Sequence, residues 1–518
     1  MMTRGSLIFD DVVFYYESAG APVFDGLSCR LAAGWTGVIG PNGSGKTTLL
    51  HLACGRLMPA GGTIRSPETV VYCPQRTDDP PEDLDGFLTA DDGPACGLRG
   101  RLAIGPDWAC RWETLSHGER KRAQIGVALW RRPGVLAVDE PTNHIDLPAR
   151  KLLTGAMRSF QGIGLLVSHD RELLDGLCRQ CLFVEPPGAV LRPGGYTKAV
   201  ELARAEQQQA RRARSQAKDE LDRLGREAAE RQRQAARSHR LRSKGRVARK
   251  DHDAKYRINA ARISGKDTQA GRTLRQLDGR LRKAREALEG IHVTRDRRLG
   301  MEMRGERSQR DSLAGLPAGQ LALGDARNLV YPELSIAPDD RIALVGPNGS
   351  GKSTLIRHIM GGLDLQEDRV LYLAQEIDRA EGRRVVREVR RLPKDRLGAV
   401  LSAVACLGSE PQRLIETDQP SPGELRKLML ALGLARRPYL IVMDEPTNHL
   451  DLPSIECLES ALSDCPAALL LVSHDLRFLR RLEKTRWQIS TDTDDPTGAR
   501  MRLRVHPANS DSEARPNV

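Results

Sequence analysis

Short, nearly uninterrupted apolar runs recur along this chain and alternate with segments of helix-forming composition. Runs of this kind are typical of strands that are buried on both faces of a parallel sheet. Strands that alternate with helices along the sequence indicate an α/β fold. The runs occur twice in the same order, at residues 36–39, 135–138 and 165–167 and again at 342–345, 440–443 and 469–472.

The middle of the chain has a different pattern. Residues 200–240 and 273–288 are rich in Ala, Gln, Glu, Arg and Leu, which predicts two helices, and residues 241–271 predict the loop that joins them into a hairpin. The residues after about 490 are polar, which predicts a mobile tail. We therefore expect an α/β domain at 1–199, a helical linker at 200–310, a second α/β domain at 311–488 and a polar tail at 489–518.

The charge of the chain is concentrated in the linker. The chain of 518 residues has a net charge of +12, but residues 201–300 alone hold 29 Lys and Arg against 14 Asp and Glu. Residues 231–250 contain nine basic residues and no acidic one. A hairpin with a dense positive tip is suited to bind phosphate groups of a nucleic acid.

Four motifs show that the chain is a tandem duplication. Gly-Pro-Asn-Gly-Ser-Gly-Lys occurs at 40–46 and 346–352, and Asp-Glu-Pro-Thr-Asn-His followed by Ile or Leu and then Asp occurs at 139–146 and 444–451. A Ser-X-Gly-Glu segment and a Leu-Val-Ser-His-Asp segment also recur in the same order in each half. The two α/β domains therefore carry the same set of candidate binding and catalytic motifs.

A Gly-rich loop between a strand and a helix binds phosphates through its backbone N–H groups. In the pattern found here, the lysine reaches the β and γ phosphates and the next hydroxyl ligates Mg²⁺. We therefore predict ATP and Mg²⁺ as ligands. The predicted contacts are Gly40, Asn42, Gly43, Gly45, Lys46, Thr47 and Thr48 in the first loop, and Gly346, Asn348, Gly349, Gly351, Lys352, Ser353 and Thr354 in the second.

Two pairs of acidic residues follow buried apolar runs. Asp139 and Asp444 end such runs, at 93 and 92 residues from the loop lysines, and are predicted to hold Mg²⁺. Glu140 and Glu445 come next and are predicted to be the general bases that activate water. A solvated strand end does not explain why the pair recurs at nearly the same distance.

Together these motifs resemble those of the ATP-binding cassette superfamily, in both halves of the chain. The resemblance implies that His169 and His474 are switch histidines of the active sites, and that Gln75 and Gln375 sense Mg²⁺ and the γ-phosphate. Tyr16, 30 residues before Lys46, is placed to stack on adenine. The equivalent place in the second cassette is around Ala322, and the first aromatic residue after it is Tyr331.

The resemblance also implies that two cassettes of one monomer close head to tail, so that each active site is composite. Ser421 and Gly423 are then expected opposite the Lys46 loop, and Ser116 and Gly118 opposite the Lys352 loop. The family pattern Leu-Ser-Gly-Gly-Gln is altered here to Leu-Ser-His-Gly-Glu and Pro-Ser-Pro-Gly-Glu, which restricts the backbone at this point.

The repeated acidic motif, the charged hairpin and the lack of a membrane domain resemble the ABC-F class. That class acts on ribosomes, with the linker entering the E site toward the peptidyl-transferase centre, in translation or in resistance to antibiotics. The 70 residues from Lys46 to Ser116 leave little room for the arm of some ABC-F translation factors, which favours the resistance branch. The predicted rRNA contacts are Arg240, Arg242, Lys244, Arg246, Arg249 and Lys250.

Other functions stay open on the sequence alone: a solvated spacer between cassettes, an ATPase subunit of a membrane transporter, a DNA-repair cassette ATPase, and a non-catalytic binding protein. The longest aliphatic stretches, such as 467–472, are far shorter than the ~20 residues that span a bilayer, so we expect no membrane partner. The N-terminal residues contain no apolar segment of a secretory signal, so we expect a cytoplasmic protein. We expect no DNA partner, because zinc-binding CxxC pairs and coiled coils of hundreds of residues are missing. Cys178 and Cys181 have a metal-like spacing but no second pair. The sequence names no drug and does not say whether both sites hydrolyse ATP.

Overall fold

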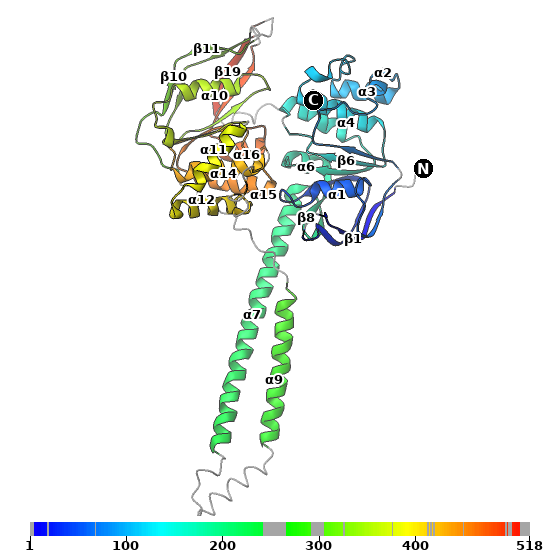
Figure 1. Cartoon of the computed structure of the whole chain (residues 1–518), viewed down its shortest axis with the longest axis vertical. Helices are drawn as coiled ribbons and strands as arrows, with labels where there is room; N and C mark the ends of the chain where they lie inside the picture. The colour runs from blue at the N-terminus through cyan, green and yellow to red at the C-terminus, as the bar shows by residue number, and fades with distance from the viewer. Residues whose placement is uncertain are drawn as a thin grey trace, which may run out of the picture. The chain divides into compact units, whose positions relative to one another are not determined.

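The computed structural model has two α/β cassettes and a pair of long helices inserted between them in the sequence (Figure 1). The contacts group the chain into one unit of residues Met1–Ala199 and Arg297–Val518 and another of Val200–Asp296. The structure describes residues 5–507 except 18–19, 68, 144, 242–265, 292–304, 325–326, 376, 412–413, 415–416, 418–419, 449, 493–494 and 496–499.

The first cassette is built on a six-stranded, mostly parallel sheet and a three-stranded antiparallel one. In spatial order the larger sheet is β5 (Val70–Cys73), β6 (Val135–Asp139), β7 (Ile163–Val167), β3 (Gly34–Ile39), β8 (Cys178–Glu185) and β9 (Gly188–Pro193). The smaller sheet is β2 (Phe24–Leu31), β1 (Leu7–Phe14) and β4 (Gly61–Arg65). The helices are α1 (Lys46–Ala53), α2 (Leu84–Thr89), α3 (Gly93–Leu102), α4 (His117–Trp130), α5 (Leu147–Met157) and α6 (Arg171–Leu177).

The second cassette repeats this order of parallel strands within an eight-stranded sheet. In spatial order that sheet is β11 (Gly319–Ala322), β12 (Asn328–Tyr331), β19 (Arg500–Pro507), β18 (Thr485–Thr491), β14 (Arg341–Val345), β17 (Ala468–Val472), β16 (Leu440–Asp444) and β15 (Val370–Leu373). A separate pair is β10 (Ala314–Leu316) with β13 (Leu334–Ile336). The helices are α10 (Lys352–Gly361), α11 (Arg379–Arg390), α12 (Lys394–Cys406), α14 (Pro422–Ala435), α15 (Leu452–Ser463) and α16 (Leu476–Leu482).

The predicted parallel strands are confirmed. All five residues of β6, of β7, of β16 and of β17 are buried, as expected of strands covered on both faces. In each cassette the strand that precedes the Gly-rich loop pairs in parallel with the strand that precedes the Ser-His-Asp segment. These pairs are β3 with β7 and β14 with β17. The carboxyl ends of these strands therefore meet at one edge of each sheet, where ligands bind in α/β folds.

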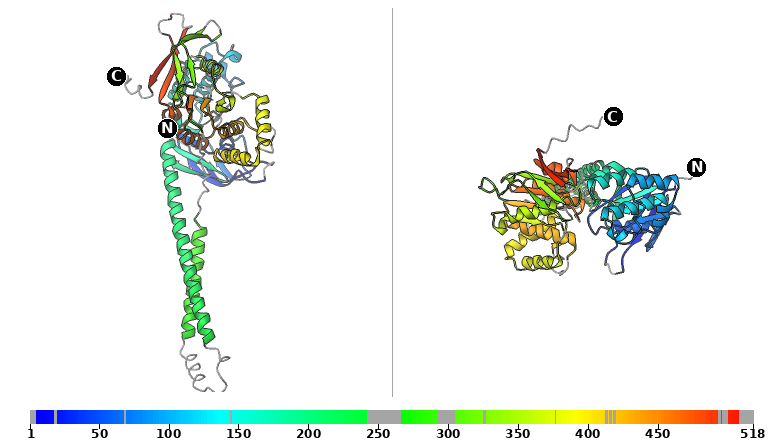
Figure 2. Two further views of the ribbon diagram at one scale, coloured as in Figure 1. Left: turned by 90° about the vertical axis from the view of Figure 1, so that its left-hand side faces the viewer. Right: turned by 90° about the horizontal axis from the view of Figure 1, so that it is seen from above.

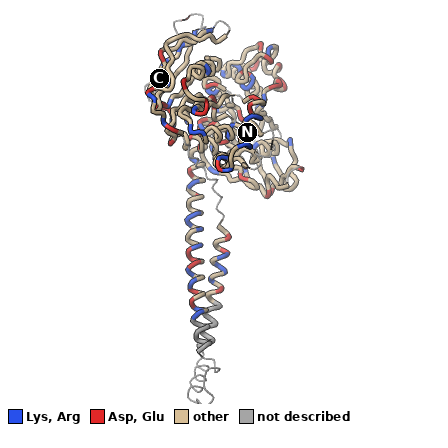
Figure 3. The backbone as a smooth tube through the Cα atoms, turned by 60° about the vertical axis from the view of Figure 1, so that its left-hand side comes forward, with Lys and Arg blue, Asp and Glu red and all other residues tan. Residues whose placement is uncertain are grey.

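The inserted unit contains most of α7 (Tyr196–Leu241) and all of α9 (Lys266–Glu289), which run side by side in two views (Figures 1 and 2). Leu224 and Ala228 of α7 are buried against Leu277 of α9. Ion pairs such as Arg223 to Glu220 line the exposed faces, and Figure 3 shows both signs of charge along the described helices. The described part of the linker is thus a pair of helices with a narrow apolar seam, and most of the predicted loop between them lies outside the described residues.

Two expectations about the second cassette's limits were wrong. Residues 489–518 were expected to be a mobile tail, but β18 and β19 pair antiparallel, and Met501 and Leu503 are buried; residues 508–518 of the expected tail lie outside the described residues. The alternation of apolar and basic residues from Met501 onward was the missed signal of a strand with one covered face. The linker was expected to reach 310, yet the backbone N–H of Glu306 already donates to the carbonyl oxygen of Pro438 at 3.0 Å.

In the described part of the chain, no helix combines the length and the apolar composition that crossing a bilayer requires.

Candidate nucleotide-binding sites

Two glycines fix the shape of the Gly-rich loops. Gly45 and Gly351 directly precede α1 and α10 with φ angles of 94° and 95°, in the region that favours glycine. A Cβ atom on Gly45 would lie 2.5 Å from Val23 Cγ1, and one on Gly351 would lie 2.5 Å from Leu323 Cδ2. Both the backbone and the space therefore require glycine where the loop turns its N–H groups toward a ligand.

Each loop lysine lies folded over its own loop. The Lys46 ammonium donates to the carbonyl oxygens of Gly40 and of the next residue, at 2.9 Å each. The Lys352 ammonium makes the same two bonds, to Gly346 at 2.8 Å and to the next residue at 2.9 Å. Burial lowers the pKa of both ammonium groups, although nearby carboxylates oppose the shift. A ligand with several negative oxygens would offset the cost of burying these charges.

The loops also hold polar atoms that suit a phosphate ligand. The hydroxyl oxygens of Ser44 and Ser350 are buried and have no hydrogen-bond partner. Buried hydroxyl groups are normally paired, so an unpaired one at the same place in both loops points to a ligand oxygen. The residues present therefore fit a bound triphosphate.

A hydroxyl and a carboxylate meet beside each loop. Thr47 Oγ1 donates to Asp139 Oδ2 at 2.9 Å, and Ser353 Oγ donates to Asp444 Oδ2 at 2.7 Å. Burial raises the pKa of Asp444, while the bond from Ser353 opposes the shift. Oxygen atoms of this type are the ligands that Mg²⁺ prefers, so both pairs are suited to hold that ion.

The adjacent glutamates have a strained backbone. Glu140 and Glu445 have φ angles of 45° and 51°, which residues other than glycine rarely adopt. Their N–H groups donate to Val167 at 2.9 Å and Val472 at 2.8 Å, which holds them at the strand ends. Burial first, and the neighbouring aspartate as well, raise the pKa of each carboxyl to about 8. Such a group is poised to take up a proton near neutral pH.

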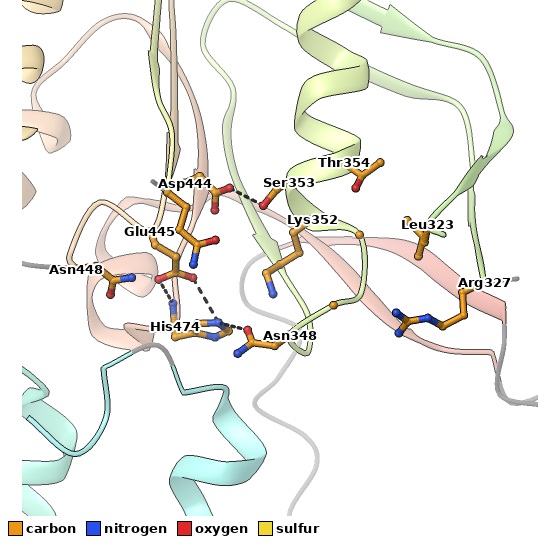
Figure 4. Close-up of a pocket in the computed structure, with 13 residues that line it drawn as sticks. Leu323, Arg327, Asn348, Lys352, Ser353, Thr354, Asp444, Glu445, Asn448 and His474 are labelled. Carbon is orange, nitrogen blue, oxygen red and sulfur yellow. Dashed lines mark hydrogen bonds and ion pairs between the residues drawn. The ribbon is translucent and has the colours of Figure 1, made fainter. Parts of the chain in front are cut away.

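A histidine lies against each of these glutamates. His169 Nε2 is 3.0 Å from Glu140 Oε1, and His474 Nε2 is 3.4 Å from Glu445 Oε1 and 3.1 Å from Asn348 Oδ1 (Figure 4). Burial lowers the pKa of His474 to about 4, so its ring is neutral at pH 7. The backbone N–H of each histidine also donates to the same glutamate, at 3.2 Å. The histidine thereby fixes the position of the carboxylate.

The first cavity combines residues of both cassettes. It has a volume of about 860 Å³. Its lining contains all the residues expected at the first site apart from Gly40, namely Tyr16, Asn42, Gly43, Gly45, Lys46, Thr47, Thr48, Gln75, Asp139, Glu140 and His169 together with Ser421 and Gly423. Ser421 caps α14 with its side chain, and Pro422 stands at the first helical position, where its fixed φ is favourable. The altered signature thus still forms a helix start that faces the Lys46 loop.

The second cavity is smaller and less complete. Its volume is about 400 Å³. Its lining includes Asn348, Gly349, Gly351, Lys352, Ser353, Thr354, Gln375, Asp444, Glu445 and His474 (Figure 4). Among the described residues, Ser116 and Gly118 do not line it, although Ser116 caps α4 as Ser421 caps α14. The composite character of this second site therefore stays a prediction.

Several residues at the sites were not singled out in the sequence. Asp451, the last residue of the repeated acidic motif, accepts a 2.8 Å hydrogen bond from the backbone N–H of Asn42 in the other cassette. Asn143 lines the first cavity and Asn448 lines the second. The repetition of the motif was a signal for all three, but their chemistry depends on contacts that lie far away in the sequence.

Buried cations brace the glutamine segments from behind. The Lys121 ammonium, which has no exposed surface, donates to the carbonyl oxygens of Pro74 at 2.6 Å and of Gln75 at 3.3 Å. Arg426 takes the equivalent place in the second cassette and donates to the carbonyl oxygens of Gln375 and, at 2.6 Å, of Glu445. Nothing in the sequence marked these two residues, because basic residues on a helix are most often solvated.

Outside these sites, Cys178 and Cys181 are buried thiols whose pKa values are raised by burial. Among the described residues, no group of three or more His, Cys, Asp or Glu side chains is arranged to bind a metal ion. Of the predicted rRNA contacts, Arg240 lies in α7 but its side chain is outside the described part. Arg242, Lys244, Arg246, Arg249 and Lys250 lie outside the described residues altogether.

Comparisons with known proteins identify the family and the fold of the two cassettes. A family model described as "ABC transporter" matches residues 24–143 and 331–448. The ATP-binding protein Uup of Caulobacter vibrioides is 30% identical over 89% of this chain and 74% of its own length. The ribosome protection protein VmlR of Bacillus subtilis is 27% identical over 92% of this chain and 86% of its own. A solved archaeal ribosome recycling factor, aABCE1, aligns with a TM-score of 0.61 at 18% identity over 95% of this chain and 89% of its own, which is a likeness of fold.

Proposed function

This chain belongs to the ABC-F family of ATP-binding cassette proteins and is an ATPase, and from that premise we propose that it acts on the ribosome. ATP binding closes the two cassettes of a monomer, and the hairpin reaches along the E-site tRNA region toward the peptidyl-transferase centre. There it modulates translation or displaces an antibiotic, and hydrolysis of ATP releases the protein. The name of VmlR, a ribosome protection protein, supports this proposal.

At each site the loop lysine and the backbone N–H groups bind the β and γ phosphates. Mg²⁺, when bound, neutralises phosphate charge, and Thr47, Gln75 and Asp139 would hold it at the first site. Ser353, Gln375 and Asp444 would hold it at the second. The raised pKa of Glu140 and of Glu445 suits a base that takes a proton from the attacking water. His169 and His474 hold that base in place through the contacts described above.

The observation that carries the proposal is the first cavity. Ser421 and Gly423 stand in the same lining as Lys46 and Glu140, so the contents of this site are sensed by both cassettes at once. Hydrogen-bond donors at a helix start favour the γ-phosphate, which is lost on hydrolysis. A change of nucleotide is thereby converted into a change in the contact between the cassettes.

The hairpin supports the choice of partner. We assign residues 200–310 to the linker, apart from the part that packs on the second cassette, and its basic tip is suited to RNA phosphates. Its single aromatic residue, Tyr256, leaves recognition to the shape and backbone of folded RNA. A transporter subunit would have no use for a hairpin of this charge.

The first experiment compares binding to ribosomes in the two nucleotide states. Glu140→Gln combined with Glu445→Gln removes both bases and leaves the loops intact, so this variant should bind ATP, stay closed and pellet with ribosomes. The wild type should pellet with a non-hydrolysable ATP analogue and be released with ATP. If the same amount of protein pellets with ribosomes whichever nucleotide is present, the proposal is contradicted.

The second experiment tests the hairpin tip. Changing Arg240, Arg242, Lys244, Arg246, Arg249 and Lys250 to Ala should weaken ribosome binding and reduce the logarithmic salt slope by roughly four to five units. A matched control removes six exposed basic residues of the second cassette: Arg383, Arg384, Arg387, Arg391, Lys394 and Arg396. If the two variants lose equal affinity, the tip has no special role. Drug susceptibility of cells that carry each variant separates resistance from a general role in translation.

A further inference from the structure

The hairpin that carries Tyr16 in the first cassette is shorter in the second. Phe14 pairs with Phe24 across the first hairpin, so residues 15–23 form the connection. Ala322 pairs with Asn328 across the second hairpin, so residues 323–327 form the connection. The shorter connection of the second cassette therefore has no counterpart to the segment that bears Tyr16 in the first.

Tyr16 is held as a platform at the first site. Its hydroxyl oxygen lies 2.9 Å from Thr48 Oγ1, and its ring meets the ring of Phe14 edge-on at 5.0 Å between centroids. The side chain is 41% exposed and lines the cavity. A ring that is fixed at one edge and open on a face can stack on a base without losing further freedom.

The second cavity has no such ring. Apart from His474, which lies against Glu445, no aromatic side chain of the described residues lines it. Tyr331 is 6% exposed in the apolar core, with its hydroxyl oxygen 3.4 Å from His358 Nε2, so it is not a platform either. The place near the loop is taken by Leu323 and Arg327 (Figure 4).

Arg327 is positioned by the short hairpin. Its carbonyl oxygen accepts from the N–H of Leu323 at 2.8 Å, and its own N–H donates to Gly324 at 2.9 Å. Its Nη1 atom would lie 3.7 Å from a Cβ atom on Gly349, which places the guanidinium beside the phosphate loop. No ion pair joins it to another described residue, and its side chain is exposed, so the planar group is available to a ligand.

We propose that Arg327 is the base platform of the second site, where its guanidinium plane stacks on the nucleobase as Tyr16 does at the first. A guanidinium group stacks on flat π systems of any base and reads no base edge in that position. The second site therefore accepts nucleoside triphosphates with little preference for adenine. This inference rests on the proposed function only in that the second cavity holds a nucleoside triphosphate.

The test isolates the second site in the full-length chain. Lys46→Met silences the first loop, and calorimetric titration then measures binding of ATP, GTP and inorganic tripolyphosphate, each with Mg²⁺. Arg327→Ala should weaken ATP and GTP binding by roughly tenfold, as expected for a cation over a π face, and leave tripolyphosphate binding unchanged. Arg327→Tyr should restore nucleotide binding. ATP and GTP should bind within about threefold of each other, since stacking is tolerant of the base.

Each other outcome has a definite meaning. Equal weakening of ATP and tripolyphosphate would make Arg327 a phosphate contact and overturn the inference, and so would unchanged ATP binding. A preference for ATP over GTP of more than about tenfold would overturn the relaxed specificity. Failure of the Lys46→Met chain to bind any nucleotide would instead refute the assignment of the second site.

A matched control and a second method complete the design. In the Lys352→Met chain, Tyr16→Ala should weaken ATP by a similar factor, because it removes the platform of the first site. If Lys46→Met does not fold, photolabelling of the wild type with an azido-purine triphosphate replaces it. Label on the peptide that contains Arg327 supports the inference. Label that is found on other peptides of the second site, but not on this one, overturns it.

Discussion

Arg171 provides a quantitative test of how the two cassettes are held together. It begins α6, directly after the Ser-His-Asp segment of the first cassette, and pairs with two carboxylates of the second, Glu459 on α15 and Asp475 at 3.0 Å. The exposed side-chain fractions are 3% for Arg171, 2% for Glu459 and 15% for Asp475. The cluster thus lies out of water, between the start of α6 in the first cassette and Glu459 and Asp475 of the second.

The variant Arg171→Met keeps most of the side-chain volume and removes the charge. It leaves Asp475 without this cation and leaves Glu459 paired only with the half-exposed Arg481, at 3.4 Å, which costs about 3 kcal/mol. At about 2–4 °C per kcal/mol for a domain of this size, the first thermal transition should fall by roughly 10 °C. Scanning calorimetry of the full chain is the appropriate assay, because a protein with several domains does not unfold in one step.

The interface offers its own control. Arg480 pairs with Glu172 across the same contact at 3.4 Å, but its side chain is 65% exposed. Arg480→Met should therefore cost less than about 1 kcal/mol. Adding Glu459→Gln to Arg171→Met should recover part of the loss. If Arg171→Met lowers the transition no more than Arg480→Met, the buried cluster does not stabilise the contact and the reasoning is refuted.

Three further results are expected. Only the ionised form of Glu140 or Glu445 accepts a proton, and the pKa of each is raised to about 8. We therefore expect kcat/KM for ATP hydrolysis to rise with pH through about 8. A pH profile that is flat from pH 6 to 9 would exclude these two residues as the bases. Gly45→Ala should abolish nucleotide binding at the first site, because its Cβ would lie 2.5 Å from Val23, whereas Gly43→Ala, with nothing within 4 Å, should lose less; equal titration curves for both variants would contradict this. Lys121→Met should lower stability by about 1–3 kcal/mol and slow hydrolysis, because it leaves the Pro74 carbonyl unpaired; an unchanged melting curve and rate would show that the brace is dispensable.

Much of the fold and most of the site residues could be read from the sequence, because their signals are local. The Gly-rich loop is a backbone conformation that a few consecutive residues specify, and Gly45 shows it through its φ of 94°. The buried strands follow from continuous apolar runs. The strand β19 was missed, although Met501 and Leu503 alternate with arginines, because its polar surroundings suggested a tail.

The two phosphate loops, the acidic pairs at the strand ends and the charge of the hairpin follow from local patterns in the amino-acid sequence. The three-dimensional structure was needed to show which residues meet across the cassettes, such as Asp451 with Asn42 or Arg171 with Glu459. It also decided that Arg327, and not Tyr331, stands at the second cavity. Contacts between residues hundreds of positions apart leave no periodicity or spacing in the chain, because they depend on how two separately folded surfaces fit together.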